Sequence, residues 1–257
     1  MQLETKDDLY FNIIGIGKTG KEILDRIDDS ILDYFMKNRF YTHVIPSLPL
    51  YIDVLGDFYL KKYYINDLSD VINIRNNRSF RNDYYNIIIY DDCDYDLANE
   101  LVKNLLGESL FLNIGICING NKKIDNLKVI ETNNMDAKDV VFNLIACLFP
   151  TYSFYAISEM DYIGFFEDEY KYKAFNAISK SLRNEHNILE EKIGNIKDNV
   201  IDTLILVTTK NQWTLLDQVK IVYVIRNGLI EGDKGFYQFK ESPLDDEIVT
   251  VICKIKE

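Results

Sequence analysis

The chain has 257 residues, of which 47% are hydrophobic, and carries 41 acidic residues against 29 lysines and arginines, a formal charge of −12. Its length suits one large domain or two medium ones. The excess of acid repels phosphate backbones and argues against nucleic acid as a partner, and no apolar run approaches the roughly 18 residues of a membrane span.

The cysteines give no sign of a disulfide framework or of a zinc site. All four are scattered without a CxxC pair, and histidines number only two. Three of the cysteines lie in apolar runs, where a free thiol behaves as a small hydrophobic side chain. The first eight residues are too polar and acidic for a signal peptide. These features predict a cytoplasmic protein in a reducing compartment without a bound metal.

The first part of the chain begins with a strand, a turn and a helix. Leu9 to Ile14 predicts a strand, and the apolar spacing from Lys18 to about Ile31 predicts an amphipathic helix after a glycine turn. Phe40 to Ile45 predicts a second strand. The stretch 50–84 has mixed periodicity, and we expect only a helix near 64–72 within it.

A buried strand and a run of acids come next. Tyr85 to Tyr90 is almost continuously apolar, which is typical of a strand covered on both faces. Acids follow at once, and we expect Asp96 to cap a helix that runs to about Leu106 and closes at Gly107. Leu110 to Ile118 and Leu127 to Ile130 predict two further strands.

The pattern changes after an apolar helix expected at 136–149. This helix is apolar on most of its surface, so it should lie between layers. The remaining chain predicts, in order, a helix at 168–183, a strand at 202–207, a helix at 213–226, and a hairpin of strands 235–240 and 247–255.

The fold class expected is therefore α/β: a Rossmann-like, doubly wound, mostly parallel sheet joined by a central helix to a smaller α+β domain. The division is 1–135 for the Rossmann-like domain, 136–150 for the central helix and 151–257 for the α+β domain.

The glycine turn is the main candidate for a ligand site. Its residues are Gly15, Ile16, Gly17, Lys18, Thr19 and Gly20, a GxGxxG pattern after a strand and at the start of a helix. Such a turn brings backbone N–H groups close to a phosphate at the positive end of the helix. The alternative is that the glycines only permit close packing of helix on strand.

Two familiar nucleotide motifs fit less well. In a Walker A loop, Glu22 would stand where Ser or Thr must reach magnesium, so this interpretation fails. An NAD-binding domain needs an acid at the end of its second strand, and residues 44–47 offer Val, Ile, Pro and Ser instead.

A third interpretation rests on resemblance. Residues 11–24 resemble the first strand and phosphate loop of FtsZ, a member of the tubulin superfamily. The last part of the chain resembles the second domain of FtsZ more closely, in the segments 167–178, 202–229, 235–242 and 245–252. The resemblance implies a tubulin/FtsZ-like fold, GTP or GDP as the nucleotide, and assembly with itself or with an FtsZ/tubulin-type filament.

The family's glycine-rich signature loop, GGGTGTG, is absent. The corresponding junction contains four carboxylates instead, Asp91, Asp92, Asp94 and Asp96. They would repel a triphosphate unless a metal intervened. We interpret them as an acidic surface turn with a helix cap, with a magnesium or calcium site as the alternative.

The resemblance also implies where catalytic acids would lie. In FtsZ, a neighbouring subunit presents acids after the central helix, and Glu159 and Asp161 fall in the matching region of this chain. The surrounding family pattern is not kept, and the alternative is that both are ordinary surface acids.

Two functions follow as hypotheses. The first is a divergent FtsZ/tubulin-like protein that acts by association, with weak or absent GTP binding and with GTPase activity in question. The second is a nucleotide-binding enzyme or sensor that uses the glycine turn. A protein without any small ligand stays open as well.

Overall fold

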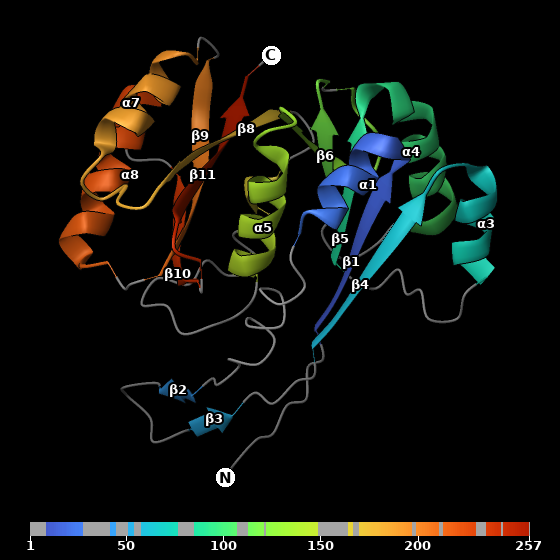
Figure 1. The fold of residues 1–257 in the computed structure, drawn as a ribbon, viewed down its shortest axis with the longest axis horizontal. Helices are drawn as coiled ribbons and strands as arrows, with labels where there is room; N and C mark the ends of the chain where they lie inside the picture. Colours follow the sequence, from blue (N-terminus) through green and yellow to red (C-terminus); the bar gives the residue numbers. More distant parts are fainter. Residues whose placement is uncertain are drawn as a thin grey trace.

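The computed structural model describes residues 9–27, 42–44, 51–53, 58–76, 85–106, 113–120, 122–148, 164–166, 170–196, 199–210, 213–229, 235–242 and 244–256. Figure 1 shows one broad twisted sheet with helices on both faces. The sheet has nine strands in the order β10-β9-β11-β8-β7-β6-β5-β1-β4. The expected α/β fold with a mostly parallel sheet is confirmed.

The first part of the sheet is entirely parallel. Its strands are β1 (Leu9–Ile16), β4 (Phe58–Ile65), β5 (Tyr85–Asp91), β6 (Asn113–Ile118) and β7 (Lys128–Thr132). Its helices are α1 (Gly17–Asp25), α3 (Leu68–Asn76), α4 (Tyr95–Leu101) and a π-helical continuation of α4, η2 (Val102–Leu106). Residues 87–89 of β5 are buried isoleucines that face alternate sides, as expected for a strand covered twice.

The last part of the sheet mixes directions. It contains β8 (Lys171–Ser179), α7 (His186–Gly194), β9 (Val200–Thr209), α8 (Leu215–Leu229), β10 (Phe236–Glu241) and β11 (Glu247–Ile255). Strand β11 runs antiparallel between β8 and β9, whereas β10 pairs in parallel with β9. The two parts of the sheet meet where β7 and β8 pair at Ile130↔Tyr172 and Glu131↔Lys173.

The central helix is confirmed as α5 (Ala137–Leu148), and its side chains from 139 to 147 are all buried. One apolar core lies beneath α1 and α5 on one face of the sheet and extends across both parts. Two other cores lie on the opposite face, one under α3, α4 and η2, the other under α7 and α8.

A buried polar network fixes α5 to the last part of the sheet. The Asn143 side-chain amide donates to the carbonyl oxygens of Leu206 and Ile248, at 3.2 and 3.3 Å, and to the Thr250 hydroxyl at 2.8 Å. Its carbonyl oxygen accepts from the Thr208 hydroxyl at 2.8 Å. All four partners lie on β9 and β11, so the polar contacts of Asn143 all reach the same part of the sheet.

Three asparagines form a ladder across the other part of the sheet. The Asn12 amide donates to Asn86 at 2.9 Å, and the Asn86 amide donates to Asn113 at 2.8 Å. They are register partners on β1, β5 and β6, and all three are buried. Buried amides are stable in a core only when such bonds are made.

The strand expected at 40–45 is confirmed as β2 (Thr42–Val44), but it pairs with β3 (Tyr51–Asp53) in a separate two-stranded sheet and not with β1. Two other features of the first part differ from the expectation. The strand beside β1 is β4, at the edge of the main sheet, where lysines are tolerated and hide the apolar pattern. The helix expected at 64–72 begins only at Leu68, because residues 64 and 65 belong to β4.

The helix cap after β5 was also misassigned. The Asp91 carboxylate caps a 3-10 turn, η1 (Asp92–Asp94), by accepting from the backbone N–H of Cys93, and α4 follows with Asp94 at its N-cap position. Asp96 lies within the first turn of α4. The sequence also predicted that the helix after β5 closes at Gly107 and that the first helix ends near Ile31. Both positions lie outside the described residues.

The last part contained two further errors. The segment expected as a helix at 168–183 contains strand β8, because Tyr172 and Ala174 pack under α5 while Phe175 and Ala177 pack under α7 and α8. In a strand that is buried on both faces, apolar and polar residues no longer alternate, so its sequence can be mistaken for that of a helix. The expected hairpin is wrong because β9 lies between β10 and β11, and helix α7 was not foreseen.

Within the described residues, no helix combines the length and the apolar character needed to cross a bilayer.

Candidate functional site

The glycine turn lies at the point where the order of the parallel strands reverses. Strand β1 has β4 on one side and β5 on the other. The helices that follow β1 and β5 pack on opposite faces of the sheet, which leaves a crevice between the ends of these two strands. Ligands of doubly wound sheets bind in the crevice at such a switch point, outside the carboxyl ends of the strands. The candidate site is therefore formed by the start of α1 and by the acidic turn after β5.

Two of the glycines are required by packing. A Cβ atom on Gly15 would lie 2.7 Å from the carbonyl oxygen of Gly20, and one on Gly20 would collide with the carbonyl oxygen of Ile89. Helix α1 therefore crosses β1 and β5 at backbone contact. Gly15 and Gly20 have a structural role whether or not a ligand is bound.

Gly17 is different because it faces the crevice. Its φ of 63° lies in the left-handed region, and it begins α1. The preceding residue is Ile16, which has no polar side chain to cap the helix, so the first backbone N–H groups of α1 lack a cap from that position. A positive φ at the start of a helix without a side-chain cap is a backbone geometry that can bind anions.

The acid that faces this turn is Asp94. A Cβ atom on Gly17 would collide with the Asp94 carboxylate, so the carboxylate lies directly against the Gly17 backbone. Burial, with a smaller contribution from Asp91, raises the pKa of Asp94 above its usual value. A negative side chain thus lies beside the positive end of α1, where a phosphate would otherwise be attracted.

The lysines of the turn point elsewhere. The Lys18 side chain is exposed, and its Nζ lies 3.8 Å from Glu22, one turn along the helix. The Lys21 ammonium donates to Asp25 at 2.6 Å and lies over the Tyr64 ring, 4.9 Å from its centroid. Thr19 is half-buried. The turn therefore offers backbone donors rather than lysine side chains to the crevice.

The loops after β5 and β6 are held together by their own side chains. Lys122 Nζ lies 3.2 Å from the Asp92 carboxylate and 5.3 Å from the centroid of the Tyr95 ring. A Cβ atom on Gly120 would collide with the Asp92 carboxylate. The Tyr95 hydroxyl donates to the Lys123 carbonyl oxygen at 3.0 Å. These contacts join the acidic turn after β5 to the loop after β6.

The acidic turn is not arranged as a metal centre. Across the part of the chain that the structure describes, no three His, Cys, Asp or Glu side chains are grouped to hold a metal ion. The acids instead cap η1, pair with Lys122 and face Gly17. The alternative of a magnesium or calcium site formed by Asp91, Asp92, Asp94 and Asp96 therefore finds no geometric support.

Two buried groups lie beneath this turn. Tyr90 and Cys117, on β5 and β6, are fully buried beside each other. Burial raises the pKa of Cys117 to about 12, and burial together with the thiol raises the pKa of Tyr90. Both therefore stay neutral at physiological pH, and Cys117 is unreactive as a nucleophile. Their strands were apolar, so nothing in the sequence distinguished them from core.

The test for an NAD-type acid had been applied to the wrong strand. The next strand of the main sheet after β1 along the chain is β4, and Asp67 follows its end. The Asp67 carboxylate accepts from the Ser69 backbone N–H at 2.8 Å and from its hydroxyl at 2.5 Å, and these bonds lower the pKa of Asp67. The acid thus exists, but it caps the start of α3.

The proposed catalytic acids Glu159 and Asp161 lie outside the described residues. A cavity of about 190 Å³ lies beside the β7–β8 junction, lined by residues that include Asn119, Glu131, Thr132, Lys173 and Phe175. It is smaller than the roughly 300–1,000 Å³ typical of small-molecule sites.

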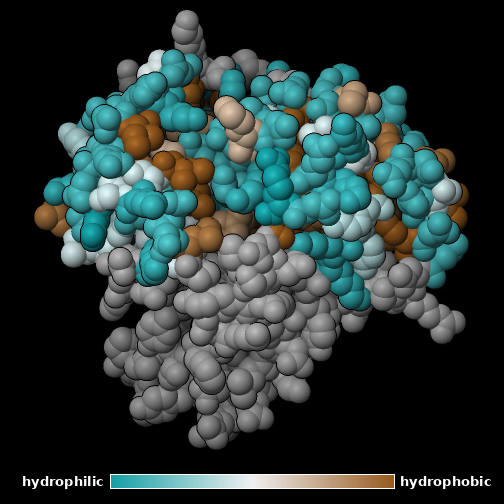
Figure 2. Space-filling view, viewed as in Figure 1, coloured by the Kyte–Doolittle hydropathy of each residue, from teal (hydrophilic) through white to brown (hydrophobic). Residues whose placement is uncertain are grey.

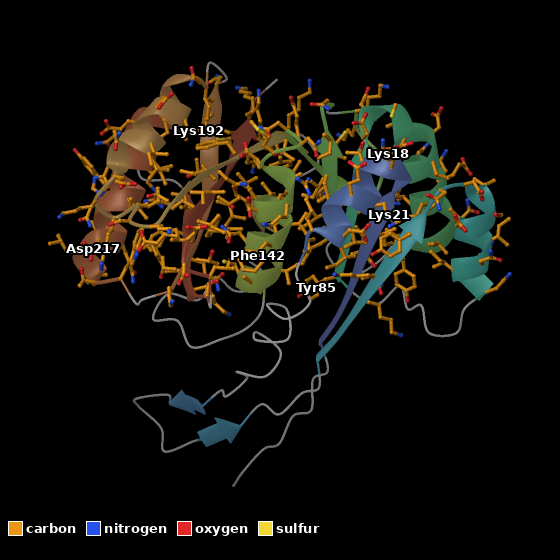
Figure 3. All side chains as sticks on the ribbon, in the orientation of Figure 1. Lys18, Lys21, Tyr85, Phe142, Lys192 and Asp217 are labelled. Atoms are coloured by element: carbon orange, nitrogen blue, oxygen red, sulfur yellow. The ribbon has the colours of Figure 1, made fainter. Side chains whose placement is uncertain are left out.

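Figure 3 shows Lys18 and Lys21 on α1 in one part of the molecule, and Lys192 and Asp217 on α7 and α8 at the opposite end. The crevice and α8 are therefore separate surfaces.

Comparison with known proteins gives a likeness of fold. No family model matches the chain, and no curated protein sequence matches it. An empty FtsZ dimer from M. jannaschii is similar in structure, with a TM-score of 0.59 and 10% identity over 96% of this chain and 88% of that one. CetZ from Methanosaeta thermophila gives a TM-score of 0.53 and 9% identity over 97% and 87% of the two chains. A plasmid-segregation TubZ gives 0.52 and 11% over 97% and 88%. The chain therefore has the FtsZ/tubulin-like fold, and its sequence identity to these solved structures is only 9–11%.

Proposed function

We propose that this protein acts by association, with copies of itself or with a filament of the FtsZ/tubulin type, and that it holds GTP or GDP weakly or not at all. The observation that carries the proposal is the Asp94 carboxylate against Gly17, at the start of α1. In this proposal, the chain's own carboxylate lies where a phosphate would bind at the start of α1.

The energetic argument is electrostatic. A phosphate at the α1 N-terminus would lie within a few ångströms of Asp94, and at an effective dielectric constant of 20 two unit charges about 4 Å apart repel by roughly 4 kcal/mol. Asp91 adds to this repulsion from the same turn, whereas the charge of Asp92 is balanced by Lys122. The formal charge of −12 disfavours the approach of a triphosphate from solution as well.

Of the two functions considered, only association requires no bound nucleotide. Within the division proposed from the sequence, the glycine turn belongs to 1–135, the central helix to 136–150, and helix α8 to 151–257. Glu159 and Asp161 remain the proposed acids that one copy would present to its neighbour, should the crevice of that neighbour hold a nucleotide. The expected cellular compartment remains the cytoplasm.

A second function, that of a nucleotide-binding enzyme or sensor, is favoured by one observation. Gly17 keeps a positive φ at the start of an uncapped helix, which is the geometry of a phosphate turn. This function requires the Asp94 carboxylate to be neutral or displaced. The raised pKa of Asp94 favours its neutral form at acidic pH.

Calorimetry with GTP, GDP, ATP and NAD tests the two functions directly. We expect the wild type to bind each of them more weakly than about 1 mM. Asp94→Asn, which keeps the size of the side chain and removes its charge, should strengthen GTP binding by at least about tenfold. Asp96→Asn, in the same acidic turn, is the matched control and should have no such effect.

Two results would decide against the proposal. Micromolar GTP binding by the wild type that is lost in Gly17→Asp would establish the nucleotide-binding alternative. A protein that stays monomeric at all concentrations, and that does not co-sediment with an FtsZ-type filament, would refute the association itself.

A further inference from the structure

A second opening of the sheet lies at the carboxyl end of β7. Strands β7 and β8 pair at only two positions, and β7 ends at Thr132, whereas β8 continues to Ser179. Helix α5, which follows β7, covers one face of the sheet, and α7, which follows β8, covers the other. Sheets of this kind bind ligands outside the carboxyl ends of their strands. The cavity of about 190 Å³ lies at this opening.

A row of three side chains forms the floor of the cavity. Glu131 and Lys173 are register partners on β7 and β8, and Cys253 is the partner of Lys173 on β11. Tyr172 belongs to the core under α5, so its neighbour Lys173 points to the opposite face, where Cys253 is buried. Neighbouring strands are about 5 Å apart. A carboxylate and an ammonium group therefore line the same cavity from adjacent strands, beside a buried thiol.

The two sides of the cavity differ in polarity. The first part of the chain supplies the polar residues Asn119, Glu131 and Thr132, whereas the last part supplies the apolar residues Phe175, Ile196 and Cys253. Figure 2 shows that this last part also has hydrophobic side chains at its surface, on the exposed face of α8. A ligand of the cavity needs charged groups at one end and an apolar group at the other.

We propose that this cavity binds a small amino acid in its zwitterionic form. The ligand ammonium would lie on Glu131, its carboxylate on Lys173, and its side chain against Phe175 and Ile196. Both charged groups of an α-amino acid are attached to one carbon atom, so they can face two side chains of adjacent strands at once. Charge-assisted hydrogen bonds of this kind are roughly twice as strong as neutral ones.

The overall charge of the protein agrees with a zwitterion. The chain has a formal charge of −12, which repels anions from solution, whereas a ligand without net charge is not repelled. Glu131 and Lys173 also contribute no net charge to the cavity. A molecule with one charge of each sign therefore matches the site better than a carboxylic acid or an amine alone.

The rim of the cavity is held by bonds within the chain. The Asn119 backbone N–H donates to the Thr132 carbonyl oxygen at 3.2 Å, and the Thr132 hydroxyl donates to the Ala174 carbonyl oxygen at 3.3 Å. The Asn133 side-chain oxygen accepts from the Asp136 backbone N–H at 2.9 Å, at the start of α5. A preformed rim loses little conformational freedom when a ligand binds.

The volume limits the ligand and its affinity. At about 30 Å³ per water molecule, 190 Å³ corresponds to roughly six water-sized groups, the size of a small amino acid such as alanine or valine. The cavity is too small for a nucleotide or another drug-sized ligand. We expect L-valine to bind with a dissociation constant on the order of 0.1–1 mM.

Calorimetry and thermal unfolding of the full chain with L-valine are the first test. The wild type should release or absorb heat on binding and should unfold at a higher temperature when the ligand is present. 3-Methylbutanoate lacks the ammonium group of valine, and 2-methylpropylamine lacks its carboxylate. Each should bind at least about tenfold more weakly than L-valine, and L-phenylalanine should be excluded by its size.

Two substitutions locate the site. Lys173→Met and Glu131→Gln keep the approximate size of each side chain and remove its charge, and each should weaken the binding of L-valine by at least about tenfold. The matched control is Lys171→Met, on the same strand but exposed and outside the cavity, which should bind like the wild type. Circular dichroism should show that all three variants are folded.

Three results would overturn the inference. Absence of heat and of any rise in unfolding temperature with the wild type up to about 20 mM L-valine would refute binding, without the need for a variant. Equal affinity for L-valine and for either single-charge analogue would refute a zwitterionic site. Unchanged affinity in both Lys173→Met and Glu131→Gln would place the ligand elsewhere. None of these measurements depends on whether the protein associates or binds GTP.

Discussion

Replacing Asn143 with alanine should lower the free energy of unfolding by about 4 kcal/mol. The Asn143 side chain makes four hydrogen bonds to β9 and β11, and each buried bond of this kind contributes about 1 kcal/mol net. The truncation also leaves a small void beneath a fully buried helix, which adds to the cost.

The assay is equilibrium unfolding in urea, followed by circular dichroism and by the fluorescence of Trp213, which is buried in the core under α7 and α8. Asn73→Ala, on the exposed side of α3, is the matched control and should change stability by less than about 0.5 kcal/mol. Thr208→Val combined with Asn143→Ala should cost less than the sum of the two single changes, because both remove the same bond. A loss below about 1 kcal/mol for Asn143→Ala would show that the network does not hold α5 to the sheet.

Two other substitutions test packing and burial. Gly20→Ala should lower the free energy of unfolding by about 3 kcal/mol, because the added methyl group meets the Ile89 carbonyl oxygen. Gly194→Ala has open space around the added methyl group and should be tolerated. Thermal unfolding measures both variants, and equal effects would contradict the packing role of Gly20. Burial lowers the pKa of Lys240 to about 7, far below its value in the unfolded chain. Between about pH 7 and pH 10.5 the unfolded state therefore binds more protons than the folded state. The wild type should thus gain stability as the pH rises through this window. Lys240→Met should be more stable than the wild type near pH 7, and the difference should shrink towards pH 10; a difference independent of pH would show that Lys240 keeps its ordinary pKa in the folded state.

The local sequence pattern was enough to predict those helices, strands and turns that have one dominant pattern of residues. The isoleucine run of β5, the glycine turn at Gly17 and the apolar helix α5 were all recognisable, because each has one dominant pattern. Strand β8 was mistaken for a helix, since its two faces pack under different helices and Ala174, Ala177 and Ile178 happen to have helical spacing. The pattern of a segment reflects what covers it, and the cover of β8 comes from distant parts of the chain.

The candidate site was only partly predictable for the same reason. The sequence indicated that carboxylates replace the glycine-rich loop after β5. It did not indicate that Asp94 would lie against Gly17, because that contact depends on β1 and β5 being neighbours in the sheet. The pairing of β10 with β9 and the exposed face of α8 likewise depend on long-range order. The functions of the glycine turn residues and of Glu159 and Asp161 remain predictions.

The asparagine ladder has a consequence for how the chain reaches its fold. Because side chains of a strand alternate between faces, a slip of β5 by one residue would turn the Asn86 amide into the apolar core beneath α1 and α5. Such a slip would also break the bonds of Asn86 to Asn12 and Asn113, and each buried amide left unbonded costs roughly 1–3 kcal/mol. Misaligned intermediates are thereby penalised several times over, which keeps three strands of nearly interchangeable isoleucine sequence from settling into competing alignments during folding.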